Sequence, residues 1–109
     1  MNPLYGLWKI KIHKLVVSED FKSIDAYQQR LILKDIHKKL SLDPKGYGKP
    51  LLGELKGYWR LRVGDYRVIY KIKEEIIEVL VVKVGIRRNE EVYKDLFHRF
   101  KKLQDKHFS

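Results

Sequence analysis

Residues 58–84 constrain the fold more than any other part of the chain. Two segments of this stretch alternate between apolar and polar side chains, which is the two-residue period of a half-buried strand. They are separated by Gly64 and Asp65, a pair typical of a tight hairpin turn. After a second turn, the chain is almost continuously apolar and β-branched, as in a central strand. The stretch therefore predicts three consecutive antiparallel strands, at residues 58–63, 66–72 and 76–84, with the second turn at residues 73–75.

The N-terminal part of the chain predicts one further strand and two helices. Residues 8–12 alternate like a strand, whereas apolar side chains recur at helical spacing between residues 21 and 40. Ser18 is followed by two acidic residues and is therefore expected to cap the start of a short helix. A break near Ser23 or Asp25 is expected to separate this short helix from a longer one.

The remaining segments complete the predicted order of elements. Residues 41–57 contain glycine and proline at short intervals and predict a loop. Gly85 is expected to end the central strand, and Asn89 to begin a final helix. The buried face of that helix is expected to comprise Val92, Leu96, Phe100 and Leu103. An N-terminal strand, two helices, a three-stranded antiparallel meander and a C-terminal helix together predict a single α+β domain over residues 1–109.

The composition points to a polyanionic partner. The chain has 24 Lys and Arg against 14 Asp and Glu, which gives a formal net charge of +10. A highly charged surface that only confers heat stability should add both signs about equally, so the excess of one sign favours nucleic acid. The absence of Cys excludes disulfides, thiolate zinc sites and Cys nucleophiles, and it suits a reducing cytoplasm. The sequence has neither an apolar run long enough for a membrane span nor a signal-peptide core, and we expect no membrane association.

Five arginines are expected to converge at one end of the meander. Arg60 and Arg62 share a strand face with Tyr58, because alternate residues of a strand point the same way. Arg67 begins the partner strand, and two more arginines follow Gly85. The five are Arg60, Arg62, Arg67, Arg87 and Arg88, and nearby tyrosines (Tyr58, Tyr66, Tyr93) could stack on unpaired RNA bases.

A guanidinium binds phosphate oxygens with a planar fork and does not lose its proton, which suits this end of the sheet to RNA. The alternative interpretation is that these arginines pair with nearby carboxylates on a solvated face. Those carboxylates belong to Glu54, Asp65, Glu90 and Glu91. No set of Asp, Glu and His has the spacing of metal ligands, and no Gly-rich phosphate loop precedes a helix, so we expect neither a metal nor a cofactor.

Four segments of the sequence resemble the RelE/ParE toxin superfamily, and RelE most closely. They are residues 51–55 (LLGEL), 58–70 (YWRLRVGDYRVIY), 82–88 (VKVGIRR) and 91–93 (EVY). The order of elements is similar as well, so the resemblance covers nearly the whole chain. It implies a RelE-like fold and a metal-independent, ribosome-dependent endoribonuclease that cleaves mRNA in the ribosomal A site and inhibits translation. It also implies a cognate RelB-like antitoxin that wraps around the toxin.

The resemblance also implies which residues act. Arg67 begins the second strand of the hairpin, Arg87 follows the central strand, and Tyr93 opens the last helix, as the family's catalytic residues do. Two lysines of the family correspond to Tyr58 and Arg60, and a guanidinium is a poor general base because its pKa stays above about 12. The predicted catalytic residues are Arg60, Arg67, Arg87 and Tyr93, and the predicted phosphate- or RNA-binding residues are Tyr58, Arg62, Arg88 and Lys83.

Because both lysines are absent, the sequence does not identify the general base. Lys83, or Lys49 and Lys56 in the loop, could approach the site. The absence of both lysines also leaves two alternatives to the nuclease. One is a ParE-like toxin that inhibits DNA gyrase, and the other is a degenerate toxin that binds ribosomes without cleaving mRNA.

Overall fold

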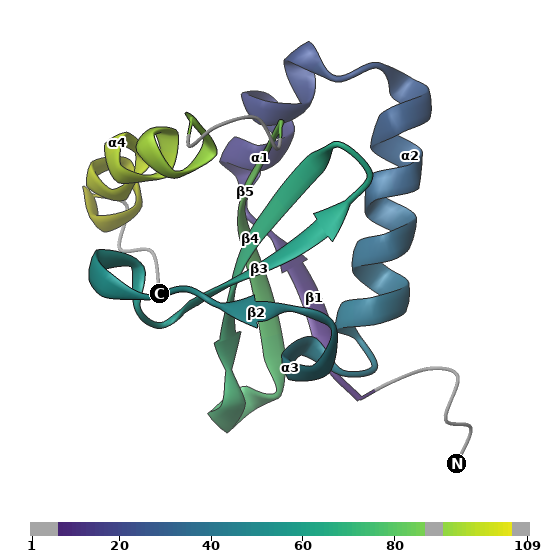
Figure 1. Ribbon diagram of the computed structural model, residues 1–109, viewed down its shortest axis with the longest axis vertical. Helices are drawn as coiled ribbons and strands as arrows, with labels where there is room; N and C mark the ends of the chain where they lie inside the picture. The colour runs from purple at the N-terminus through teal and green to yellow at the C-terminus, as the bar shows by residue number, and fades with distance from the viewer. Residues whose placement is uncertain (1–6, 87–90, 106–109) are drawn as a thin grey trace.

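A five-stranded sheet with helices on both faces forms the structure, a computed structural model that describes residues 7–86 and 91–105 (Figure 1). The strands are β1 (Lys9–Ile12), β2 (Lys49–Pro50), β3 (Tyr58–Val63), β4 (Tyr66–Lys73) and β5 (Glu78–Ile86). The helices are α1 (Lys14–Ser18), α2 (Ala26–Asp35), α3 (Pro44–Tyr47) and α4 (Glu91–Asp105). Shorter 3₁₀ turns are η2 (Asp20–Ser23), η4 (Gly53–Leu55) and η5 (Glu74–Ile76), and α2 continues as a π-helical turn, η3 (Ile36–Leu40).

The strand order is β1-β5-β4-β3-β2, which confirms the predicted α+β fold and its central meander. β3, β4 and β5 pair antiparallel in sequence order, and β1 pairs parallel with β5. Gly64 has a φ of +57° at the β3–β4 turn, a value that suits the first central position of a type II′ hairpin. β5 is buried on both sides over its first seven residues, as the continuous apolar run predicts.

Two apolar clusters lie on opposite faces of the sheet, because alternate strand residues point to opposite sides. One cluster joins the sheet to α1, α2 and η3, and it includes Val16, Ile32, Ile36, Val68 and Tyr70. The other joins the sheet to α4 and η4, and it includes Leu55, Ile69, Val82, Val92 and Leu96. In Figure 1, α2 and α4 accordingly lie on opposite sides of the sheet. Within the described residues, none of the helices combines the length and apolar character needed to cross a bilayer.

Several expected boundaries were wrong. The predicted short helix is the 3₁₀ turn η2, which follows Glu19 rather than a Ser18 cap. Ser18 instead ends α1, which was not predicted and which the His13 side chain caps by accepting a hydrogen bond from the Leu15 amide. The break before the longer helix is confirmed, with Asp25 accepting from the Gln28 amide as its N-cap. β5 begins and ends two residues later than predicted, and Gly85 lies within it rather than after it.

Residues 41–57 are more ordered than the predicted loop. They contain α3, β2 and η4, and they are held against the sheet by the buried Tyr70 hydroxyl, which donates to the Pro44 carbonyl at 2.5 Å. Burial, with a smaller contribution from the charge of Asp43, raises the pKa of Tyr70 well above its usual range. The final helix is confirmed, and Val92 and Leu96 are buried on it as expected. Asn89 and the Leu103 side chain lie outside the described part of the chain.

Candidate nucleic-acid interface

The β3–β4 hairpin brings two arginines directly opposite each other. Arg62 on β3 pairs with Arg67 on β4, and Arg67 in turn pairs with Gly85 on β5. Directly opposed residues lie on the same face of a sheet, with their Cβ atoms about 5 Å apart. Two like charges at that separation disfavour the fold unless an anion compensates them.

Gly85 allows the first turn of α4 to approach this row of residues closely. A Cβ atom at Gly85 would lie 2.9 Å from Val92 Cγ2 and 3.2 Å from Val92 Cβ. Contacts this short are not tolerated, so any larger residue would push the helix away from β5. The close approach places Tyr93, which follows Val92, next to Arg67.

Arg67 and Tyr93 form the central contact of the site. Arg67 Nη1 donates to Tyr93 Oη at 3.2 Å, and the guanidinium carbon lies 5.4 Å from the centroid of the tyrosine ring. Arg67 Nε is buried and has no hydrogen-bond partner among the described residues. Arg67 also makes no ion pair with a described carboxylate, unlike Arg99, which pairs with Glu19 and Asp20.

The residues expected around this pair are placed differently. Arg60 is half-buried on the same face as Arg62, two residues away, and lies opposite Lys49 of β2. Arg62 is exposed. Tyr58 is half-buried against α4, with its ring centroid 5.4 Å from that of Phe100, and burial raises its pKa. Tyr58 therefore contributes to the packing of α4. Arg87 and Arg88 lie outside the described residues.

The position of Lys83 corrects its expected role in phosphate binding. The residue is buried, with 8% of its surface exposed. Its Nζ lies 2.9 Å from Asp20 Oδ1 and 3.7 Å from Asp95 Oδ2. An ammonium group already held between two carboxylates is poorly placed to bind phosphate oxygens, so Lys83 is a partner of buried carboxylates instead.

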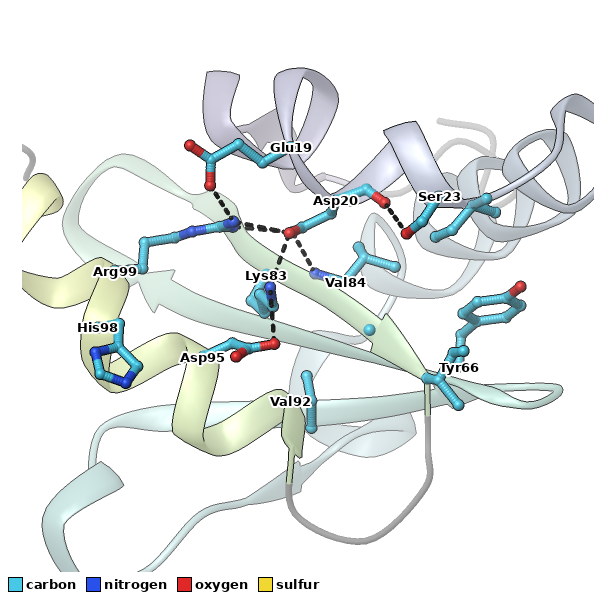
Figure 2. Close-up of a pocket in the computed structure, with 13 residues that line it drawn as sticks. Glu19, Asp20, Ser23, Tyr66, Lys83, Val84, Val92, Asp95, His98 and Arg99 are labelled. Atoms are coloured by element: carbon cyan, nitrogen blue, oxygen red, sulfur yellow. Dashed lines mark hydrogen bonds and ion pairs between the residues drawn. The ribbon is translucent and has the colours of Figure 1, made fainter.

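Two hollows flank α4. A cavity of about 480 Å³ lies between η2, the end of β5 and one side of α4, and is lined in part by Ser23, Tyr66 and His98 (Figure 2). A more open groove of about 450 Å³ lies between η4 and the other side of α4. Its lining includes Leu52, Tyr93 and Phe97, so the Tyr93 ring faces this groove as well as Arg67.

Sequence reasoning missed Asp20 and Arg99, which form ion pairs with each other beneath the first cavity. A signal for them was present. Arg99 lies in the apolar stripe of the last helix, three residues after Leu96 and four before Leu103, and Lys83 lies in the apolar run of the central strand. Cations in apolar stripes are buried only with a partner, which predicts a buried carboxylate without saying which one.

Solved toxin structures share this fold. The chain superimposes on the isolated RelE toxin of E. coli with a TM-score of 0.60 at 17% identity, covering 85% of this chain and 98% of that one. The sheet, the two helical layers and the element order are thus those of the RelE-like toxins. The chain belongs to the family described as the ParE toxin of type II toxin–antitoxin systems, whose model matches residues 10–91.

Three further similarities place it within the RelE/ParE superfamily. A chain of the RelBE2 toxin–antitoxin complex from Mycobacterium tuberculosis matches with a TM-score of 0.71 at 25% identity, over 77% of this chain and 95% of that one. A chain of the archaeal RelE–RelB complex from Pyrococcus horikoshii matches with a TM-score of 0.58 at 27% identity, over 76% and 98%. Toxin RelG of M. tuberculosis is 42% identical over 48 residues, which are 44% of this chain. The chain spans about half the length of that curated relative, 55%.

Proposed function

We propose that this chain is the toxin of a type II toxin–antitoxin system and that it cleaves mRNA in the A site of cytoplasmic ribosomes. The observation that carries the proposal is the Arg67–Tyr93 pair beside Arg62. Arg67 has a buried Nε without a hydrogen-bond partner and no ion pair with a described carboxylate, so it has an unsatisfied demand for an anion, and Arg62 lies directly opposite it. A backbone phosphate of RNA meets this demand, and the formal net charge of +10 favours its approach.

The geometry suggests how the work is divided. Cleavage by attack of the 2′-hydroxyl builds negative charge on the phosphorane and requires a proton for the leaving 5′-oxygen. We assign the stabilisation of the phosphorane charge to Arg67 and Arg62, which are directly opposed, with Arg60 further along the same face. Because Tyr93 Oη accepts its hydrogen bond from Arg67, its own O–H proton remains available for the leaving oxygen. We retain Arg87 in the phosphate site and Arg88 in RNA binding on the strength of the family resemblance.

We also propose a RelB-like antitoxin as the resting partner. Two similar structures with at least 25% identity, those from M. tuberculosis and P. horikoshii, are toxin–antitoxin complexes, and the high positive charge suits an acidic protein. The surface carries apolar side chains that a partner could bury. Leu52, in the groove beside α4, is 83% exposed, and Tyr27, on α2, is 60% exposed.

Mapping mRNA ends on translating ribosomes tests the proposal. Purified protein should produce codon-positioned cuts with 2′,3′-cyclic phosphate ends, and Arg67→Ala should abolish them. Removing a group that stabilises charge only in the transition state costs about 100- to 1000-fold in rate. Arg30→Ala is the matched control, because Arg30 is an exposed arginine on α2, on the other face of the sheet. A folded Arg67→Ala variant that cuts as fast as Arg30→Ala would remove Arg67 from the site.

The family match to the ParE model favours a second candidate, inhibition of DNA gyrase. It predicts intact mRNA, stalled gyrase on DNA and no effect of the protein on translation in a purified system. Intact mRNA together with salt-dependent ribosome binding would instead identify a toxin that binds ribosomes without cleaving mRNA.

A further inference from the structure

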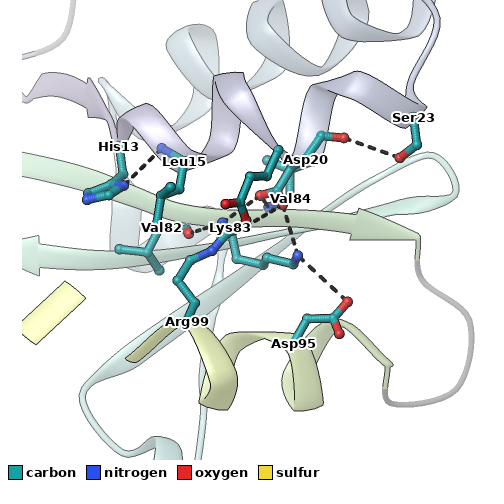
Figure 3. Close-up of polar contacts among 10 residues, drawn as sticks. His13, Leu15, Asp20, Ser23, Val82, Lys83, Val84, Asp95 and Arg99 are labelled. Carbon is teal, nitrogen blue, oxygen red and sulfur yellow. Dashed lines mark hydrogen bonds and ion pairs between the residues drawn. The ribbon is translucent and has the colours of Figure 1, made fainter. Parts of the chain in front are cut away.

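A cluster of charged side chains joins three separate parts of the chain beneath the first cavity (Figure 3). Asp20 comes from η2, Lys83 from β5 and Arg99 from α4, and all three are buried. Glu19 and Asp95 lie at its edge, where Glu19 Oε1 accepts from Arg99 Nη2 at 3.2 Å. Burial alone would lower the pKa of Arg99, but the hydrogen bonds and charges of Asp20 and Glu19 outweigh it and raise the pKa above its ordinary value.

The Asp20 carboxylate is the centre of this cluster. Oδ1 accepts from Lys83 Nζ at 2.9 Å and from Arg99 Nη2 at 2.7 Å. Oδ2 accepts from Arg99 Nη1 at 2.9 Å and from the Val84 amide at 2.9 Å. A carboxylate has about four acceptor sites, so Asp20 is saturated. The bond also gives the Val84 amide a partner where β1 no longer does, because the pairing of β1 with β5 ends at Val81.

Arg99 is the polar anchor of α4. Besides its two bonds to Asp20, its Nη1 donates to the Val82 carbonyl at 2.9 Å. Other contacts of α4 with the sheet include the apolar packing of Val92 and Leu96, the 3.7 Å ion pair of Asp95 with Lys83, and the Arg67–Tyr93 contact itself. Apolar packing is not directional and tolerates rotation or sliding of a helix, whereas a forked guanidinium–carboxylate pair fixes one orientation. The pair therefore sets the rotation and the axial position of α4 on the sheet.

The same helix carries Tyr93, six residues before Arg99 and about 9 Å along the axis. Figure 2 shows the cluster in the space between η2 and α4, beside β5. Any rotation of α4 about its axis moves the Tyr93 hydroxyl relative to Arg67, which is fixed on β4.

We propose that Asp20 is a positioning residue for the Arg67–Tyr93 pair. Its carboxylate holds Arg99, Arg99 fixes α4, and α4 presents the Tyr93 hydroxyl to Arg67. The structural part of this inference is independent of the reaction, and its consequence for cleavage rests on the proposed function. Displacement of a reacting group by about 1 Å can cost about 100-fold in rate, so a shift in α4 is enough to impair Tyr93.

The test compares Asp20→Asn with Asp25→Asn. Both replace an aspartate by an isosteric amide, but Asp25 is an exposed N-cap of α2, and Asn serves that role equally well. Nuclear magnetic resonance reports the Arg67–Tyr93 contact directly, through the ring-current shift of the Arg67 side chain. We expect Asp20→Asn to lose this shift and to speed hydrogen exchange in α4, with β3–β4 amides unchanged. An intact shift in folded Asp20→Asn would overturn the inference.

Cleavage adds a second measurement that a general loss of stability would not reproduce. We expect folded Asp20→Asn protein to cleave about 100-fold more slowly than folded wild-type protein. In a Tyr93→Phe background the same change should cost less than about threefold, because residues that act through one another are not additive. Equal costs in both backgrounds would refute the positioning role.

Two outcomes, a variant that does not fold and a protein that does not cleave mRNA, call for other comparisons. If Asp20→Asn does not fold, Arg99→Lys takes its place, since it keeps the charge but loses the fork, and the same shift and rate comparisons decide the inference. If no variant and no wild-type protein cleaves mRNA, the proposed function fails, while the ring-current shift still decides whether Asp20 positions Tyr93.

Discussion

Replacing Arg67 by Met should stabilise the fold and abolish mRNA cleavage, whereas the same replacement of Arg99 should destabilise the fold strongly. Arg99 is buried between the sheet and α4, and Arg67 is half-buried there with its Nε fully covered. Arg99 has two carboxylate partners, and Arg67 has none among the described residues. The two changes remove the same charge and introduce the same side chain, so they isolate the effect of pairing.

The magnitude follows from the contacts of each residue. The buried Nε of Arg67 has no partner and therefore destabilises the wild-type fold by about 1–3 kcal/mol, a penalty that Met removes. Met also removes the repulsion between Arg67 and the like charge of Arg62 opposite it, which destabilises the wild-type fold by about 0.2–1 kcal/mol. It gives up the hydrogen bond to Tyr93, about 0.5–1.5 kcal/mol, and the ring contact, about 0.5–1 kcal/mol. The midpoints leave a net gain in the free energy of unfolding of about 1 kcal/mol.

Arg99→Met instead leaves the buried Asp20 without two of its four donors, at a cost of about 3–5 kcal/mol. Urea unfolding at neutral pH measures both changes, and the Arg67 variant should also melt roughly 4–8 °C higher. A residue that binds an anion can destabilise the fold in this way, because a buried donor such as Arg67 Nε is satisfied only when the ligand is bound. If Arg67→Met loses more than about 1 kcal/mol, Arg67 is a structural residue and the argument for an RNA site at the hairpin fails.

Two further predictions concern the scaffold of the site. Tyr70→Phe should lower stability by about 1–3 kcal/mol near pH 8, because the Pro44 carbonyl loses its buried donor. Since the pKa of Tyr70 is raised in the folded protein, its contribution is complete below its unfolded pKa of about 10 and is lost as pH rises above it. Between about pH 10 and pH 12 the free energy of unfolding of the wild type should therefore fall more steeply with pH than that of Tyr70→Phe. The same pH dependence in both proteins, measured by urea unfolding, would contradict this. Gly64→Ala should lower the free energy of unfolding by about 1 kcal/mol, because the φ of +57° at Gly64 disfavours any side chain. The loss should not be much larger, since a Cβ there meets no atom within 4 Å. An unchanged unfolding midpoint would show that the turn does not enforce this angle.

The local elements of this fold were predictable because their signals lie within a few residues of one another. The alternation on either side of Gly64 and Asp65 predicts the β3–β4 hairpin, and the hairpin by itself sets Arg62 near Arg67. The break near Asp25 was predictable for the same reason, since an N-cap bonds to an amide only three residues away.

Errors occurred where a local signal had two interpretations. Two acidic residues after Ser18 suit the first turn of a helix, and Asp20 does begin η2, but its side chain is buried against Lys83 and Arg99, which lie 63 and 79 residues away. Residues 41–57 have the composition of a loop, but the Tyr70 hydroxyl and the edge of β3 order them into α3 and β2. Tertiary contacts decided both outcomes, because they satisfy polar groups that the local chain leaves open.

The sequence by itself determined that this chain folds as a basic α+β domain, since periodicity, turn residues and charge are properties of neighbouring residues, and the resemblance of four short segments pointed to the RelE/ParE toxins. The tertiary structure alone decided which cations have partners. Arg99 and Lys83 share the buried Asp20 and also pair with Glu19 and Asp95 respectively, whereas Arg67 lies against Tyr93 without a described carboxylate. That difference depends on distances between residues far apart in the chain, where electrostatic energy falls with separation in space and takes no account of separation in sequence.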